Sequence, residues 1–413
     1  MSLSASRHYG VAQVFIPFAA AYLLSYVVRS VNAVLSGPFT DELGLSASEL
    51  GLLSSAYFLT FAAMQIPLGA LLDRKGPKNV EVVLLLFAVA GCLISSFASG
   101  FLALWIGRAC IGIGVSACLM ASYKAYRICF RDDLQPALAS LMLMVGSFGA
   151  LVATLPVELA LPHIGWRGVF LATTGLFLLS IVGLLWLLPK LPEPTPNHKP
   201  YWQDTLSGVK EIFAHPEIRR VIPFSIFIHG GFMAVQGLWM GPWFRTVDGQ
   251  SSTQAAVSLL ILGVVTTIAH LSMSWTLSTK VKKWGWSLDA IIIGGSTVLL
   301  ITTTAAVFNV WGNSLFGWCL MVFATGFTAV NYAKATLSFP PQMAGRANTS
   351  LNFVVFIGAF SVQWGMGVVA DLFASFGWSG ADSLRAAFIV WIFTQAFSLF
   401  WLLRKPKAAG GHP

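Results

Sequence analysis

The sequence predicts an all-α membrane protein with twelve transmembrane helices in two pseudo-symmetric halves of six. Three observations support this fold class: a composition with few charges, about twelve apolar stretches of spanning length, and an uneven distribution of basic residues. Of the 413 residues, 56% are hydrophobic and 10% are charged. A soluble domain carries about 25% charged residues, so this composition, with its mean hydropathy of +0.75, indicates a chain that lies in a bilayer.

The apolar stretches are each about 20 residues long, which is the length that a helix needs to cross the hydrocarbon core. In chain order they are 11–33, 48–70, 79–99, 101–122, 138–160, 167–189, 221–243, 254–276, 288–308, 312–333, 350–370 and 384–403. We expect helices, because the unpaired edges of strands cannot face lipid.

The basic residues indicate how these helices are oriented. With a cytoplasmic N-terminus, the 25 lysines and arginines divide into 20 on the cytoplasmic side, three outside (Arg167, Arg245 and Arg385) and two within spans (Arg29 and Arg108). This is the positive-inside pattern. The net charge of +9 therefore reflects membrane orientation and does not indicate a nucleic-acid partner. We expect a bacterial inner-membrane protein with both termini in the cytoplasm.

One long polar stretch divides the chain into an N-terminal half, 1–189, a cytoplasmic linker, 190–220, and a C-terminal half, 221–413. The linker opens with closely spaced prolines, which prevent a helix. Further on, apolar residues recur at helical spacing over 202–213 and predict a short amphipathic helix on the membrane surface. They are Trp202, Leu206, Val209, Ile212 and Phe213.

Several classes of site are absent from the sequence. The five cysteines lie in or beside apolar spans, and none has the spacing of metal ligands. The chain contains no phosphate-binding loop, nucleotide fingerprint or metal cluster. We therefore expect no cofactor, no metal, no ATP-driven step and no enzymatic activity.

A charged loop between the second and third spans carries the most specific pattern in the chain. Residues Gly69–Lys78 read Gly-Ala-Leu-Leu-Asp-Arg-Lys-Gly-Pro-Lys. The pattern Gly-x-x-x-Asp-Arg-x-Gly-x-Lys resembles the loop between helices two and three of the major facilitator superfamily. Gly165-Trp-Arg167 is also typical of that family, and 278–285 resembles a degraded copy of the loop, with Lys282 where the first copy has Asp73. The resemblance extends over the full chain and implies a monomeric transporter whose halves alternate in access around the solute.

The resemblance implies a role for this loop as a cytoplasmic gate. In the family, the carboxylate at the position of Asp73 braces the second helix against the start of the eleventh. A carboxylate favours helix N-termini and nearby arginines, and Arg346 opens the eleventh span here. The alternative is a solvated loop charge. The expected gate consists of Gly69, Asp73, Arg74, Gly76, Lys78 and Arg346.

Arg29 is the leading candidate for binding substrate. An arginine within a span costs at least about 2.5–3.5 kcal/mol and by default indicates function. The stretch Tyr26-Val-Val-Arg29 is similar to the first helix of the organophosphate:phosphate antiporters, in which this arginine holds the substrate anion. Those antiporters have a second arginine on helix seven, and 221–243 has none. One cation favours a carboxylate or a zwitterion over a doubly charged phosphate ester, and the alternative is a side chain that snorkels to the headgroups.

Polar and aromatic residues of other spans could line a cavity. Asn352, Phe356 and Gln363 recur on one face of the eleventh span, at spacings of four and seven. For each amide the alternative is a hydrogen bond between helices. The predicted substrate-binding residues are Arg29, Asn32, Tyr57, His229, Gln236, Trp239, Asn331, Asn352, Phe356 and Gln363.

Three further residues are candidates for structural or proton-linked roles. Arg108 begins Arg-x-x-x-Gly-x-Gly, which matches the fourth-helix pattern of the family, and its glycines allow close helix contact. Glu158 is the only acidic residue placed well inside a predicted span, and with His270 it is a candidate proton carrier.

The sequence thus predicts a secondary active transporter of a small organic anion or amphoteric metabolite, coupled to protons or a counter-anion. One alternative is a multidrug or metabolite exporter in which Arg29 is structural. The other is a transporter-like solute sensor that signals through a partner. The expected partners are the solute, the lipid bilayer and the coupling ion.

Overall fold

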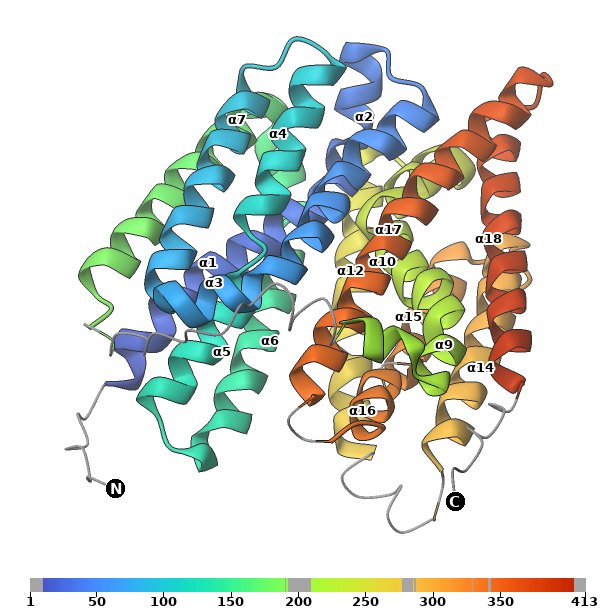
Figure 1. Ribbon diagram of the computed structural model, residues 1–413. Coiled ribbons are helices and arrows are strands. Elements are labelled where there is room, and N and C mark those ends of the chain that lie inside the picture. The colour runs from blue at the N-terminus through green and yellow to red at the C-terminus, as the bar shows by residue number, and fades with distance from the viewer. Residues whose placement is uncertain are drawn as a thin grey trace, which may run out of the picture. The chain divides into compact units, whose positions relative to one another are not determined.

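The computed structural model describes residues 10–189, 191, 209–276, 285, 287–328, 330–340 and 343–404, and the regular secondary structure in these ranges is helical (Figure 1). In this part of the chain, ten helices are long and apolar enough to cross a membrane, and Ala137–Val152 is a shorter apolar helix. One of the ten, Ala47–Ser96, covers two predicted spans, 48–70 and 79–99. The predicted all-α class with twelve spans is confirmed.

Contacts between helices divide the chain into two compact units. The first unit comprises residues 1–31 and 67–199, and the second comprises 32–66 and 200–413. The helix α3 (Ala47–Ser96) contributes to both. The other elements of the first unit are α1 (Val11–Ser30), α4 (Phe101–Gly114), α5 (Cys118–Cys129), the 3-10 turn η1 (Asp132–Leu134), α6 (Gln135–Val152) and α7 (Leu155–Trp186).

The second unit contains the remaining helices. Three of its segments, η2, η3 and η4, are π-helical turns within one continuous helix, 216–247. The elements are α2 (Asn32–Leu43), α9 (Pro216–Phe224), η2 (Ser225–Gly230), α10 (Gly231–Ala234), η3 (Val235–Trp239), α11 (Met240–Pro242), η4 (Trp243–Val247), α12 (Ser252–Thr276), α14 (Leu288–Val307), α15 (Ser314–Thr328), α16 (Val330–Leu337), α17 (Ala344–Ser375) and α18 (Gly380–Leu403).

The loop of Gly69–Lys78 is a tight turn inside α3. Gly76 has φ 76°, a left-handed conformation that glycine adopts without strain, and Pro77 follows it. The two apolar stretches on either side of Gly76 are therefore separate spans joined by a turn. Gly165, with φ 62°, divides α7 in the same way.

The glycines of the 108–114 pattern bring α4 against the second part of α3. A Cβ atom on Gly114 would lie 2.2 Å from the backbone nitrogen of Ala88, and one on Gly91 would lie 2.5 Å from the carbonyl oxygen of Gly107. Real side chains do not tolerate such distances, so glycine is required at both positions. The predicted close contact is confirmed at Gly114.

The segment 32–66 packs with the C-terminal part of the chain, since α2 contacts η3 and α11. The predicted division at the linker remains a prediction. Trp202 and Leu206 of the predicted amphipathic helix, both chain termini and Lys282 lie outside the described residues, whereas 209–214 is helical.

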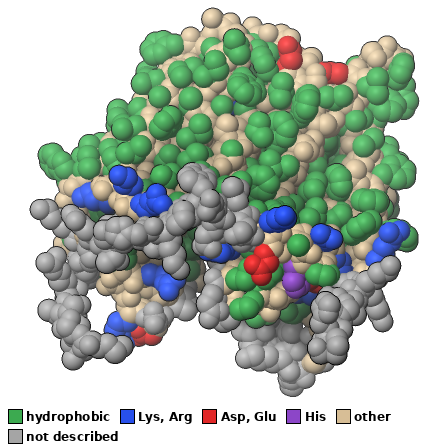
Figure 2. All heavy atoms as spheres, viewed as in Figure 1, with side chains coloured by type: hydrophobic (Ala, Val, Ile, Leu, Met, Phe, Trp, Pro, Cys, Tyr) green, Lys and Arg blue, Asp and Glu red, His purple; other side chains and the backbone are tan. Residues whose placement is uncertain are grey.

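The exposed surface fits a membrane protein. Figure 2 shows a face covered mostly by hydrophobic side chains, with lysine and arginine gathered near one end of the helices. On α7 alone, Leu171, Leu179 and Trp186 are exposed, Trp186 to 84%. Exposed apolar area on this scale requires a nonpolar surrounding.

Candidate functional site

Arg29 lies near the middle of the first apolar stretch. The helices α1 and α2 are separated only at Val31, so the stretch runs on to Leu43. The guanidinium of Arg29 is half-buried and lies over the ring of Tyr26, 4.4 Å from its centroid. The aromatic face of Tyr26 stabilises this guanidinium electrostatically, and the planar guanidinium is the side chain best suited to recognise a carboxylate.

Tyrosines surround this guanidinium. The Tyr22 hydroxyl donates to the Tyr26 hydroxyl at 3.3 Å, and the two rings meet edge to face at 5.1 Å. Tyr22 interacts electrostatically with both Arg29 and Tyr123 of α5. A Cβ on Gly146 of α6 would lie 2.8 Å from the Tyr22 ring, so α6 packs directly against this tyrosine. Arg29 therefore lies in a tyrosine-rich part of the first unit.

Arg108 supports the helix that carries Arg29. Its side chain is 1% exposed, and its Nη1 donates to the carbonyl oxygen of Val28 at 2.7 Å. Val28 directly precedes Arg29, so this bond joins α4 to α1 next to the candidate cation. The contact favours the structural role for Arg108.

A buried carboxyl near these residues escaped the sequence analysis. Glu81 of α3 is 0% exposed, and among the described residues its carboxyl oxygens have no oxygen or nitrogen hydrogen-bond partner. The Cys118 thiol of α5 lies beside it. Its one sequence signal is a lone acid in an otherwise apolar run, 80–90. It comes three residues after Lys78, at the start of the predicted span, so its place in the sequence does not indicate that it is buried.

The role predicted for Glu158 remains a prediction, but Glu158 is not the most enclosed acidic residue. Glu158 is half-buried in the first turn of α7, directly after the interruption at Thr154, while Glu81 is fully enclosed. His270, the other proton candidate of this group, is exposed on α12.

The predicted gate residues of the first unit hold the loop to neighbouring helices. Asp73, with its side chain 69% exposed, forms an ion pair with Lys124 of α5. Lys78 Nζ donates to the carbonyl oxygens of Leu185 and Leu188 at 3.0 and 3.3 Å. Lys124 was not predicted as a partner.

Arg346, the gate residue of the second unit, is exposed near the start of α17. Its pairing with Asp73 remains a prediction.

The helix 216–247, which covers the seventh predicted span, contains three π-helical turns, which often mark functional sites. His229 lies in η2, and Gln236 and Trp239 lie in η3. His229 Nε2 lies 3.2 Å from Thr328 Oγ1, Gln236 Nε2 donates to Thr266 Oγ1 at 2.9 Å, and Trp239 Nε1 donates to the carbonyl oxygen of Gln363 at 3.0 Å. The π turns place these three side chains toward α15, α12 and α17.

Buried amide oxygens distinguish three predicted residues. Asn32, Asn331 and Gln363 are 2%, 0% and 1% exposed, and each has a side-chain oxygen without a hydrogen-bond partner in the described ranges. Asn331 Nδ2 donates to Ser225 Oγ at 3.4 Å. Leaving a buried acceptor unsatisfied costs about 1–3 kcal/mol. These oxygens could therefore accept hydrogen bonds from a bound solute.

The remaining predicted residues join α3 to α17. Phe356 stacks on Phe61 with ring centroids 4.2 Å apart, and Phe61 stacks on Tyr57 at 5.8 Å. On the same face of α17, Asn352 Oδ1 accepts from the Tyr332 hydroxyl at 3.4 Å. In the second unit the predicted set thus includes an aromatic cluster and several amides.

At the predicted outer end of the helices, α17 also caps α3. The carboxylate of Asp371 accepts hydrogen bonds from the backbone nitrogens of Ala47 at 3.0 Å and Ser48 at 2.8 Å. A negative charge at a helix N-terminus is favourable. We call Asp371, Ala47 and Ser48 the outer clasp. Nothing in the sequence links these positions, because they are 323 or more residues apart.

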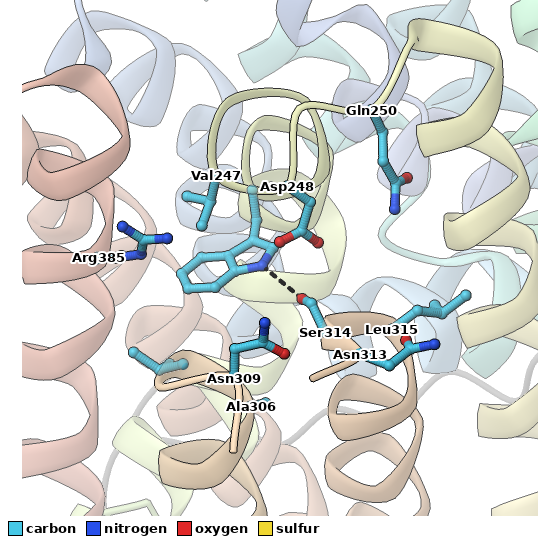
Figure 3. Close-up of a pocket in the computed structure, with 11 residues that line it drawn as sticks. Val247, Asp248, Gln250, Ala306, Asn309, Asn313, Ser314, Leu315 and Arg385 are labelled. Atoms are coloured by element: carbon cyan, nitrogen blue, oxygen red, sulfur yellow. Dashed lines mark hydrogen bonds between the residues drawn. The ribbon is translucent and has the colours of Figure 1, made fainter. Parts of the chain in front are cut away.

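Figure 3 shows a separate pocket of about 340 Å³ where η4, α14, α15 and α18 end. Trp243 Nε1 donates to Ser314 Oγ at 3.1 Å there, and burial raises the pKa of Asp248 above its usual range. The pocket is lined by Trp243, Val247, Asp248, Gln250, Ala306, Val307, Asn309, Asn313, Ser314, Leu315 and Arg385. It includes none of the predicted substrate-binding residues. Among the described residues, no cluster of His, Cys, Asp and Glu could hold a metal ion.

Comparison with known proteins places this geometry among transporters. The model of the Major Facilitator Superfamily matches residues 18–362. The D-galactonate transporter of Escherichia coli O6:H1 is 23% identical over 385 residues, which cover 84% of this chain and 86% of that protein. The purine ribonucleoside efflux pump NepI of Shigella sonnei is 25% identical over 302 residues, or 72% of this chain and 70% of that protein.

Among solved structures, a bacterial homologue of the human lysosomal transporter Spinster, in its inward-facing and unoccupied conformation, has a similar fold. The TM-score is 0.78 at 16% identity, over 97% of both chains. At this identity the likeness concerns the fold alone.

Proposed function

Because this chain belongs to the Major Facilitator Superfamily, we propose that it is a secondary active transporter of a small hydroxylated organic anion, bound through Arg29. Transport across a membrane, in place of catalysis, is the shared activity of the family and of the relatives above. The substrate class, the coupling ion and the roles of individual residues belong to the proposal.

The observation that carries the proposal is the environment of Arg29. A half-buried guanidinium in the middle of an apolar stretch, over Tyr26 and beside further tyrosines, is costly unless it has a use. Its planar fork matches a carboxylate with two parallel hydrogen bonds. The described part of the seventh span, 221–243, has no second arginine, so a singly charged anion is the best match.

The second unit, taken by itself, offers buried amide oxygens that suit a hydroxylated solute. Asn32, Asn331 and Gln363 each present an acceptor without a partner in the described ranges. Hydroxyl groups are donors that would satisfy these acceptors. A carboxylate with several hydroxyl groups fits both requirements, and the relative whose name specifies D-galactonate, a sugar acid, supports this class.

Transport would follow alternating access. Asp73 and Arg346 would close the cytoplasmic side, as the family resemblance implies, and the outer clasp of Asp371 with Ala47 and Ser48 would close the other. Both contacts are weak enough to break during a cycle, since an exposed ion pair contributes about 0–1 kcal/mol and a helix cap about 0.5–2 kcal/mol.

The test is a ligand-stability screen on purified protein with carboxylates, sugar acids, amino acids, sugar phosphates and inorganic anions, run beside Arg29→Ala and Arg29→Lys. A ligand at 100 times its Kd stabilises the folded state by about 2.7 kcal/mol and raises Tm. We expect a sugar acid to raise the Tm of the wild type. It should raise the Tm of Arg29→Lys only weakly, and it should leave the Tm of Arg29→Ala unchanged. Arg404→Ala, at the exposed end of α18, is the matched control and should behave as wild type.

An exporter of uncharged solutes is the second candidate, favoured by the similarity to the purine ribonucleoside efflux pump. In that case nucleosides would raise Tm equally in wild type and Arg29→Ala, and sugar acids would raise neither. Such a result would overturn the anion proposal.

A further inference from the structure

The pocket of Figure 3 lies within the second unit and contains none of the predicted substrate-binding residues. Its volume is about 340 Å³, and a neighbouring hollow of about 540 Å³ shares Asp248, Gln250 and Leu315 with it. Ligand pockets in proteins commonly measure about 300–1,000 Å³. The pocket therefore has room for a small organic molecule.

Asp248 gives the pocket a negatively charged acceptor. The residue is half-buried, and its Oδ2 is enclosed and has no hydrogen-bond partner in the described ranges. Burial raises the pKa of Asp248, while the Ser314 hydroxyl, the Arg385 charge and the Trp243 indole partly oppose that rise. A carboxylate oxygen accepts most strongly from a charged donor, so an ammonium group suits this position.

Two amide side chains of the same pocket present donors. Gln250 Oε1 accepts from Ser258 Oγ at 2.9 Å, and Asn313 Oδ1 accepts from the backbone nitrogen of Phe316 at 3.1 Å. An amide whose oxygen is held in this way has an NH2 group with two hydrogens left to donate. Both residues therefore suit an acceptor group of a ligand, such as a carboxylate.

Arg385 adds a positive charge at the rim. Its side chain is 45% exposed, and its Nη1 lies 3.1 Å from Asp382 Oδ1. A guanidinium has five N–H groups, so this one ion pair leaves donors for an anionic group. Figure 3 shows the Arg385 guanidinium apart from the Asp248 carboxylate. The pocket thus offers a positive and a negative group at separate places.

The balance of charge indicates which kind of ligand fits. Asp248 and Asp382 carry two negative charges, and Arg385 carries one positive charge. This excess of negative charge disfavours a solute that is only an anion. A solute that is only a cation would make no use of Arg385 or of the two amide NH2 groups. A zwitterion with no net charge matches both sides of the pocket.

We propose that this pocket binds a free α-amino acid as its zwitterion, with the ammonium group on Asp248 and the carboxylate on the donors of the rim. Trp243, Ala306 and Val307, which are at most 4% exposed, form an apolar floor for the hydrocarbon part of the ligand. The site is separate from the anion site proposed at Arg29. Because residues of η4, α14, α15 and α18 line the pocket, a bound molecule should stabilise the second unit.

The test is a thermal-stability screen of the purified full-length protein with the standard amino acids. Each amino acid that raises Tm is compared with its decarboxylated amine and its deaminated acid, because each of these keeps only one of the two charges. We expect at least one amino acid to raise the Tm of wild type and of Arg29→Ala equally. The matching amine and acid should bind about tenfold more weakly.

Variants then locate the site. Asp248→Asn keeps the shape of the side chain and should weaken amino-acid binding about tenfold to a hundredfold, and Arg385→Gln should weaken it about two- to fivefold. Leu315→Trp fills the pocket without changing its charge and should abolish binding, so it decides the matter if Asp248→Asn does not fold. The matched control, Asp41→Asn, removes a carboxylate that is 73% exposed and lies outside the pocket, and it should bind as wild type.

The proposal is overturned if no standard amino acid raises Tm, or if the rise persists in both Asp248→Asn and Leu315→Trp. A rise that disappears in Arg29→Ala would also overturn it, because the amino acid would then bind at Arg29. If no amino acid binds, mass spectrometry of the purified protein tests a lipid instead. Phosphatidylethanolamine retained by wild type and lost from Asp248→Asn would assign the pocket to a lipid headgroup. Failure of sugar acids to bind at Arg29 changes none of these outcomes.

Discussion

Two buried groups of charge in this protein are built in opposite ways. In the second unit, Glu217, Arg220, Asp289 and Lys334 form a four-charge cluster in which each carboxylate has two basic partners. Arg220 Nη1 lies 3.4 Å from Glu217 Oε1 and 3.0 Å from Asp289 Oδ1, Lys334 Nζ lies 2.5 Å from Glu217 Oε1, and Lys334 also pairs with Asp289. In the first unit, Glu81 is buried with no such partner among the described residues.

The difference teaches how to tell structural charge from functional charge. The four-charge cluster is neutral overall and joins α9, α14 and α16, and Arg220 Nε adds α18 through the carbonyl oxygen of Leu402 at 2.9 Å. Nothing in it requires a ligand. Glu81 joins no helices through ion pairs, and it is neutral only when it holds a proton. A functional role therefore explains a glutamate at this position better than a contribution to stability does.

We expect the largest loss of unfolding free energy when the four-charge cluster loses one carboxylate. In Glu217→Gln, Arg220 and Lys334 share only Asp289, and removal of one partner from a buried pair destabilises a protein by about 3–5 kcal/mol. The side chains of Glu217, Arg220 and Lys334 are 12%, 10% and 16% exposed, whereas that of Asp289 is 43% exposed. Solvent therefore compensates part of the loss, and we expect a value at the low end of this range. Chemical denaturation in detergent measures the loss.

The matched control is Glu211→Gln, an exposed residue of the preceding helical segment, which should change stability by less than about 0.5 kcal/mol. An equal loss in both variants would mean that the four-charge cluster is no more structural than a surface charge.

A second variant separates charge balance from packing. Lys334→Met added to Glu217→Gln leaves Arg220 with Asp289, one cation with one anion, and should recover about 1–2 kcal/mol of the loss. Residues in one ion-pair network commonly show interaction energies of about 0.5–3 kcal/mol. A double-mutant cycle from the same denaturation data gives this value, and additive losses would show that the pairs act independently.

Removing the charge of a carboxylate that bonds only to backbone amides should reduce stability by an intermediate amount. Asp371→Asn in the outer clasp keeps an acceptor and loses the charge that favours the α3 N-terminus, at a cost of about 0.3–1 kcal/mol. Hydrogen exchange at the Ala47 and Ser48 amides should accelerate about two- to fivefold, since 1.4 kcal/mol corresponds to a factor of ten. Ser379, whose side chain caps the N-terminus of α18, provides the comparison. Ser379→Ala should leave hydrogen exchange at the Ala47 and Ser48 amides unchanged.

Local patterns were enough to predict most of the fold. Apolar stretches located the twelve spans, because hydropathy is a property of each segment by itself. The charged loop at Gly69–Lys78 predicted the break between two spans of α3, and the glycines after Arg108 predicted close contact with a neighbouring helix. In each case the residues that determine the structure are adjacent in the sequence.

The partners in the site could not be predicted in this way. Asp371 caps a helix that begins 324 residues earlier, and Asp73 pairs with Lys124, 51 residues later. Pairing at such separations depends on how helices pack, which one sequence does not reveal. The burial of Glu81 was missed for a related reason: hydropathy locates the end of a span only within a few residues, and it does not show which face of the helix meets a neighbour.

The smallest change in stability is expected at Glu81, although it is the most deeply buried of these carboxyls. Glu81→Gln replaces a group that is neutral when protonated with a neutral amide of nearly the same shape, and the neighbouring Cys118 thiol can donate to an amide oxygen as well. Unfolding free energy near neutral pH should therefore stay within about 1 kcal/mol of wild type. A loss as large as that of Glu217→Gln would mean that Glu81 is ionised and paired in the folded protein, and the contrast between the two groups of charge would then fail.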